Sequence, residues 1–317
     1  MTADAMIDRR RLRRKVTFWR VVAFVIALVA IVSAALWQTE FSDSTKKPHI
    51  AKVRIEGTIT EDEELLGRLK DIAESSSAKG VLLAIDSPGG TTAGGEAIYE
   101  AVRKIAETKP VVAQVGTLAA SAGYMIARAS DHIVARQSSI VGSIGVIVQY
   151  PNVTELLKNI GVTVEDIKSA PLKAEPSPFN PTNEEERAMM ERMVRDSFNW
   201  FVDLVTERRP LERGEVLALA DGSVFTGRQG LKNKLVDELG GEKEAIAWLE
   251  SKDIDKDLEV IEWRKPEQVD LLSLQSIAGL ASARLFGLQG NAGGIAEALQ
   301  NEPLFLDGLV SVWHPAL

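Results

Sequence analysis

The chain of 317 residues is long enough for one large domain or two smaller ones, and its content of 45% hydrophobic and 26% charged residues is typical of a folded protein. It contains no cysteine, which excludes disulfides, thiolate metal sites and a cysteine nucleophile. His49, His132 and His314 lie far apart in the sequence without metal-binding spacing, so we expect no metal and no cofactor. The net charge of −8 argues against a nucleic-acid partner.

The amino terminus has the pattern of a membrane anchor. Residues 1–20 hold seven cations against two carboxylates, and residues 21–37 form an uninterrupted apolar run, VVAFVIALVAIVSAALW. With its flanking aromatic residues this run approaches the ~20 residues that span a bilayer. We therefore predict a basic cytoplasmic arm (1–20), a single transmembrane signal anchor in the inner (cell) membrane (21–37), and an extracytoplasmic body after a linker (38–48). The alternative is a cleavable signal, since the small residues Ser33-Ala34-Ala35 suit a signal peptidase.

The body predicts an α/β domain over residues 49–250. Short β-branched strands alternate with helical stretches, which is typical of a largely parallel sheet covered on both faces. The strands are expected at AKVRIEG (51–57), VLLAIDS (81–87), PVVAQV (110–115), HIVA (132–135), IGVIVQY (144–150) and VTVEDIKS (162–169). Residues 251–317 form a carboxyl-terminal extension, and for its segment 269–317 we keep three alternatives: a tail on a neighbouring subunit, a helix on the bilayer surface, or a disordered segment.

A proline-rich stretch interrupts the domain at residues 169–182. Its four prolines exclude regular structure, yet it joins two ordered parts, so we interpret it as a functional loop. A long helix is predicted from about Asn183 to a point before Pro210, and a smaller α/β tail over residues 221–240.

Three glycine-bearing segments follow predicted strands, where open parallel sheets place their sites. The first, DSPGG at residues 86–90, has backbone amides at Gly89 and Gly90 that could form an oxyanion hole, although a structural turn needs the same residues. The second places Ser121 among small residues at the start of a helix. The amide of Ala122 could join the oxyanion hole, but a serine there could equally be only a helix cap. The third is the turn Val141–Val146, which contains Ser143.

Together these motifs resemble the signal peptide peptidase A family in its short, single-copy form. The resemblance covers residues 50–245 and includes DSPGG, the serine before Gly123-Tyr124, GSIGV at 142–146, Ser177-Pro178-Phe179, and the DG…TG…QG…LVD pattern within 221–240. The family's Ser-Gly-x-x-Lys loop is matched by residues 169–173, with Ala170 in place of the glycine; Ala122 likewise replaces a common glycine. The resemblance implies a ClpP/crotonase-like fold and a serine peptidase with Ser121 as nucleophile and Lys173 as general base.

A lysine acts as a base only if desolvation lowers the pKa of its amine from about 10.4 towards neutrality. We expect Ser143 to orient this amine by a hydrogen bond. Lys168, which follows the expected strand, is an alternative base, and His132 is a weaker one because it reads as a turn residue before an apolar strand.

The resemblance also implies a substrate and an assembly. Family members degrade remnant signal peptides, which are hydrophobic, and form rings in which serine and lysine can come from neighbouring protomers. We therefore expect a membrane-bound homo-oligomer, in the form of an octamer. The rival interpretations are a related Ser–Lys membrane protease acting on stomatin-like proteins, a crotonase-like acyl-CoA enzyme, and a non-catalytic membrane scaffold.

Overall fold

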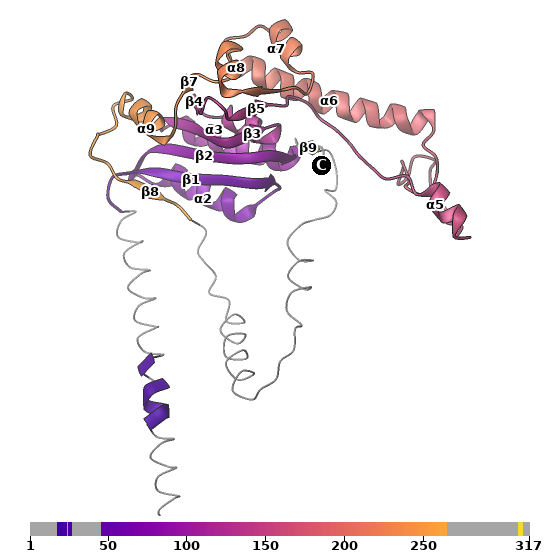
Figure 1. Ribbon diagram of the computed structural model, residues 1–317, viewed down its shortest axis with the longest axis horizontal. Coiled ribbons are helices and arrows are strands. Elements are labelled where there is room, and N and C mark those ends of the chain that lie inside the picture. Colours follow the sequence, from indigo (N-terminus) through magenta and orange to yellow (C-terminus); the bar gives the residue numbers. More distant parts are fainter. Residues whose placement is uncertain (1–17, 24, 27–45, 265–309, 313–317) are drawn as a thin grey trace, which may run out of the picture.

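The centre of the structure is a sheet of long, mostly parallel strands (Figure 1). The computed structural model describes residues 18–23, 25–26, 46–264 and 310–312. Its principal strands are β1 (His49–Ile59), β2 (Ala78–Thr91), β3 (Val111–Ala120) and β4 (His132–Ala135), and each pairs in parallel with the next. All four contain the β-branched runs expected from the sequence, so the α/β class is confirmed.

Shorter strands complete the sheet within the described residues. They are β5 (Ile140–Gly142), β6 (Val224–Thr226), β7 (Glu238–Leu239), β8 (Val260–Glu262) and β9 (Val310–Val312). The order is β6-β5-β3-β2-β1-β8, with β4 between β3 and β7, and β9 beside β2. The pairings β5–β6 and β2–β9 are antiparallel, so the sheet is mixed rather than purely parallel.

Alternating residues of the central strands pack into two separate hydrophobic layers. Leu82, Val112 and Val134 point to one face, where they meet α9 (Glu242–Glu250). Their neighbours in the sequence point to the other face and meet α2 (Glu63–Glu74), α3 (Thr92–Ala106) and α4 (Ala122–Ala127). A strand that is apolar on both faces needs cover on both, which explains why these runs are continuously hydrophobic.

The long helix α6 (Glu184–Arg208) joins this core by one end only. Asn183 begins it with a capping box to Glu186, and it ends before Pro210, as predicted. Phe201, Val202 and Val205 are buried in its second half, whereas residues 187–200 are at least partly exposed. Since the helix is roughly 37 Å long at 1.5 Å per residue, its first half projects well beyond the core (Figure 1).

The irregular segment that precedes α6 differs from expectation. Residues 144–150 and 162–169, predicted as strands, do not join the sheet; only Ile147 forms an isolated bridge. Ile144 is buried in the core, whereas the β-branched residues exposed to solvent are Ile147, Val162, Val164 and Ile167. Between them lies the short helix α5 (Thr154–Asn159), and residues 169–182 are irregular, as predicted.

The carboxyl-terminal part of the body continues the sheet. The helix α8 (Gly227–Lys232) lies with β6 and β7 in the predicted small α/β region, α7 (Arg213–Leu219) precedes that region, and β8 pairs with β1 beyond residue 250. Most of the predicted membrane span and most of the carboxyl-terminal extension lie outside the described residues. Among the residues that are described, no helix is long and apolar enough to cross a membrane.

The anchoring of α6 by its second half gives a test of stability. Phe201→Ala should lower the free energy of unfolding by about 3–5 kcal/mol, because it removes a fully buried ring between the helix and the core. Met193→Ala on the exposed first half should change it by less than about 0.5 kcal/mol. Urea unfolding of both variants measures the difference, and equal effects would contradict the one-ended attachment.

Candidate active site

The candidate site forms where β3 separates from β2. The two strands pair in parallel as far as Ser87 and Ala119, with an irregularity after Ile85. Beyond that point β2 continues to Thr91 beside β1, while β3 ends at Ala120 and turns into α4. The carboxyl ends of these strands therefore border an opening beside the DSPGG segment.

Ser121 is the residue at which β3 turns into α4. Its backbone has φ 58° and ψ −120°, a conformation that residues with a Cβ rarely adopt. Its amide donates to Gly142 O at 2.8 Å, and its carbonyl accepts from Met125 N at 2.9 Å. The hydroxyl does not cap the helix, so the alternative role of Ser121 as a side-chain cap is not what the structure shows.

Ser143 lies beside Ser121 because of the strand register. Ala120 pairs in parallel with Gly142, so the two serines occupy the next position of their respective strands. Ser143 is itself at positive φ (51°), buried, and held by its amide to Ser223 O at 2.8 Å. The predicted nucleophile and the predicted orienting hydroxyl thus come from adjacent strand ends.

The glycines of the DSPGG segment are required by close packing. A Cβ on Gly90 would lie 1.8 Å from Ile59 O, and Gly89 has φ 105°. The amide of Gly89 donates to the buried Ser87 Oγ at 3.1 Å, and this hydroxyl donates to Gly57 O at 2.6 Å. Of the predicted oxyanion donors, Gly89 is therefore already engaged. We favour Gly90 and Ala122 as the oxyanion donors. The amide of Ala122 is the first of α4 and has no partner within its own helix.

Strand β9 occupies the opening left by β3. Its residues 310–312 pair antiparallel with Thr91, Gly90 and Gly89. Since Gly89 and Gly90 pair with β1 through their other edge, β9 must lie on the side that β3 has left (Figure 1). This edge of β2 can therefore pair with an extended segment, next to the end of β3 that leads into Ser121.

Lys173 does not lie with these residues in the single chain. It is exposed, and the segment between α5 and α6 to which it belongs lies at the outer end of α6, away from the sheet (Figure 1). Its amide donates to Ala170 O at 3.1 Å, but its amine makes no hydrogen bond or ion pair with any described residue. The burial that a lysine base needs is thus absent from its own chain.

The two alternative bases fit less well. The hydrogen bonds that Lys168 donates to Asp166 and then to Glu175 raise the pKa of its amine and favour the cation. His132 begins β4, pairs with Glu238 at 3.2 Å and stacks on Trp248. His132 pairs with Val112, and Val112 lies eight residues before Ala120 on β3. At about 3.3 Å per residue, His132 is therefore roughly 26 Å from the end of β3 that leads into Ser121.

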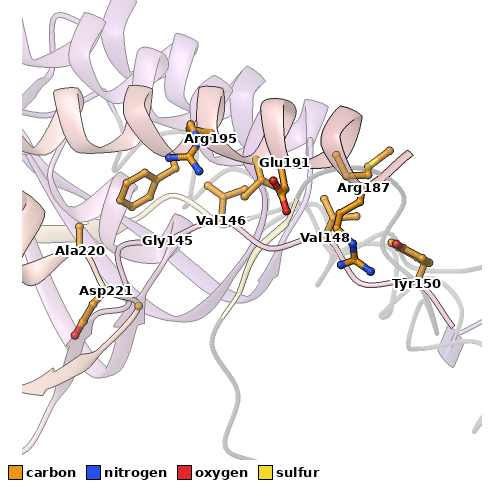
Figure 2. A pocket seen from close by; sticks show the side chains of 13 residues that line it. Gly145, Val146, Val148, Tyr150, Arg187, Glu191, Arg195, Ala220 and Asp221 are labelled. Atoms are coloured by element: carbon orange, nitrogen blue, oxygen red, sulfur yellow. The ribbon is translucent and has the colours of Figure 1, made fainter. Parts of the chain in front are cut away.

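A cavity of about 560 Å³ lies between α6 and the segment that follows Ser143, and its lining includes none of the predicted catalytic residues. Its lining begins at Gly145, two residues after Ser143, and continues to Tyr150 (Figure 2). The facing wall is α6, with Arg187, Glu191 and Arg195 among apolar residues. Within the described residues no group of three histidines or carboxylates is arranged to hold a metal ion.

Comparison with known proteins decides the class of this site. The sequence profile described as peptidase family S49 matches residues 103–255, which include both serines and Lys173. A protein of Methanocaldococcus jannaschii named as a protease is 36% identical over 219 residues, which cover 69% of this chain and 70% of that protein. The chain belongs to peptidase family S49. It is therefore a serine peptidase, a hydrolase of the signal peptide peptidase A type.

Two further relatives place this S49 peptidase among named enzymes. An Enterococcus faecium protein named signal peptide peptidase SppA is 36% identical over 203 residues, covering 64% of this chain and 59% of that protein. Protease 4 of Haemophilus influenzae is 33% identical over 207 residues, covering 62% of this chain and 34% of that protein.

Two residues of the site were missed in the sequence. Ser87 lies within DSPGG and ties Gly89 to Gly57, but serine is common in turns and gave no separate signal. Arg128 is buried at the end of α4, and burial lowers the pKa of its guanidinium to about 10. It donates to Leu204 O of α6 and so connects the helix of Ser121 to the helix of the projecting arm.

The packing of Gly90 can be tested by adding one methyl group. Gly90→Ala should abolish most peptidase activity and lower the free energy of unfolding by about 1–3 kcal/mol, because its Cβ must displace the β1 backbone. Gly67→Ala, in the exposed part of α2 with no neighbouring atoms, should raise stability by about 0.5–1 kcal/mol and leave activity unchanged. Urea unfolding and peptide hydrolysis report both effects; an active Gly90→Ala variant would contradict this account of the site.

Proposed function

We propose that this chain is a membrane-anchored serine endopeptidase that degrades remnant signal peptides with Ser121 as nucleophile and Lys173 as general base. The observation that carries the proposal is the strained backbone of Ser121 beside Ser143, in line with an edge of β2 that already holds an extended segment. Extended peptides bind such edges by main-chain hydrogen bonds, and alternate side chains enter pockets.

The reaction proceeds through an acyl-enzyme. The Ser121 hydroxyl attacks the scissile carbonyl as its proton passes to the Lys173 amine, and the oxyanion is held by the amides of Gly90 and Ala122. The lysine then gives this proton to the leaving amine as the peptide bond breaks. Water then attacks the acyl-serine as the lysine takes one of its protons. The lysine gives this proton to Ser121 Oγ as the ester bond breaks, which releases the carboxyl product and restores the serine. Ser143 orients the amine by accepting one of its hydrogen bonds.

A hydrophobic substrate and a membrane location suit the remaining features. The cavity beside Gly145 is lined by Val146, Val148 and Phe198 as well as by charged residues of α6, so its apolar part offers room for hydrophobic side chains of a peptide. The apolar run at residues 21–37 behind a basic arm favours an anchor with the amino terminus in the cytoplasm. Such an anchor would hold the peptidase on the extracytoplasmic side of the inner membrane, where signal peptides remain after cleavage.

The pair of catalytic residues is completed between copies of the chain. Lys173 is exposed at the outer end of the arm, so we propose that it enters the site of a neighbouring copy in a homo-oligomer, with the octamer as the expected form. Burial against that neighbour would supply the desolvation that a lysine base requires.

Hydrolysis of a hydrophobic, signal-peptide-like fluorogenic substrate by the full-length chain in detergent tests the catalytic pair. Ser121→Ala and Lys173→Ala should each lower kcat by at least about 10³-fold, because each removes a reacting group. Lys70→Met, at an exposed position of α2, is the control and should retain wild-type kcat. Undiminished activity in either active-site variant would overturn the assignment, and a wild type that cleaves stomatin-like proteins but not this peptide would favour the rival protease.

Mixing the two inactive variants tests the exchange of lysine between copies. Oligomers reassembled from equal amounts of the Ser121→Ala and Lys173→Ala chains should recover about a quarter of the wild-type activity, since a quarter of their sites combine both native residues. If both residues came from one chain, no site would be complete. An inactive mixture of well-assembled oligomers would therefore contradict the proposed exchange.

A further inference from the structure

The turn that carries Lys173 is closed at its base by a pair of charged residues. Lys168 and Glu175 flank residues 169–174, and the Lys168 Nζ contacts Glu175 Oε1 directly. Lys168 also pairs with Asp166 at 2.8 Å. Glu175 uses its second oxygen, Oε2, to accept from Ser177 N at 2.6 Å.

This pair differs from an ordinary surface ion pair in its burial. The side chain of Glu175 is only 7% exposed and that of Lys168 19%, although they lie on an arm whose other side chains are largely exposed. Surface pairs contribute little, but a buried carboxylate that loses its cation is left with an uncompensated charge. The two ends of the turn are therefore held together by an interaction that is costly to break.

The base of the 169–174 turn is also fixed to the rest of the arm. Ser177 is buried and its Oγ accepts from Phe179 N at 3.2 Å, while Pro178 O accepts from Val153 N at 2.8 Å, next to the start of α5. Within the turn, Lys173 N donates to Ala170 O, and Ala174 has φ 60°. These contacts connect the start of α5 through Pro178 and Ser177 to Glu175, and they leave the Lys173 amine free at the tip of the turn.

We propose that Lys168 and Glu175 are positioning residues for the general base: their buried ion pair closes the 169–174 turn and so presents the Lys173 amine in one direction. This inference rests on the proposed function, since it needs Lys173 to act as the base. Neither residue touches the substrate. Their effect is on the geometry of Lys173, and a misplacement of about 1 Å in a catalytic group can lower the rate about 100-fold.

The test is a double-mutant cycle on the full-length chain in detergent. Lys168→Met and Glu175→Gln should each lower kcat about 10- to 100-fold with little change in KM, and the double variant should lose no more than the worse single variant. Lys168→Arg keeps the cation and should stay within about threefold of wild type. The matched control is the partly buried pair Lys52–Glu242, at 2.7 Å on the main sheet, whose Met and Gln variants should retain wild-type kcat.

The pH dependence separates positioning from simple loss of folded protein. In the Lys168→Met and Glu175→Gln variants the acidic limb of the kcat/KM profile should move to higher pH, because a less firmly buried amine holds its proton more tightly. Three results would overturn the proposal: an equal loss of activity at every pH, losses of kcat that add in the double variant, or wild-type kinetics in both single variants. If instead Lys173→Ala remained active, the proposed base itself would fail, and that result is distinct from a failure of the positioning pair.

Discussion

The separation of β3 from β2 after Ser87 and Ala119 is the constraint on which the candidate site depends. β2 continues because β1 supports its other edge through Gly90. That leaves one edge of β2 unpaired by β3 at the point where the chain turns at Ser121. One change in pairing thus creates both the strand edge that β3 leaves and the adjacent amides. The extended segment β9 pairs with this edge.

The same change in pairing places backbone strain at Ser121. A residue in this region of φ and ψ costs on the order of 1–3 kcal/mol, so the surrounding structure must hold it. Gly142 O and Met125 N bind its backbone on both sides, and α4 is buried throughout. Arg128 joins the end of α4 to the backbone of α6. The strain therefore stays at the residue that is proposed to react.

The sequence predicted the parts of this site that belong to regular structure. Long β-branched runs indicated β1 to β4, and the motifs containing Gly90, Ser121 and Ser143 follow strands, so their convergence could be expected. Strands of two or three residues, such as β5 and β7, are too short to show a period of two. The loss of residues 144–150 from the sheet depends on which strand edges are free, and a local pattern carries no information on that.

The position of Lys173 could not be derived from spacing within one chain. Its exposed position on the arm favours an assembly of several copies. The projecting arm exposes Ile147, Leu156, Ile160 and Ile167, although exposed apolar residues gathered in one region usually mark a contact surface. The same arm exposes an amine that needs burial in order to act as a base. A neighbouring copy would meet both needs at once, by covering the apolar arm and enclosing the lysine beside its own Ser121. A peptidase built in this way would remain inactive as a single chain, because its nucleophile and its base meet only when copies assemble.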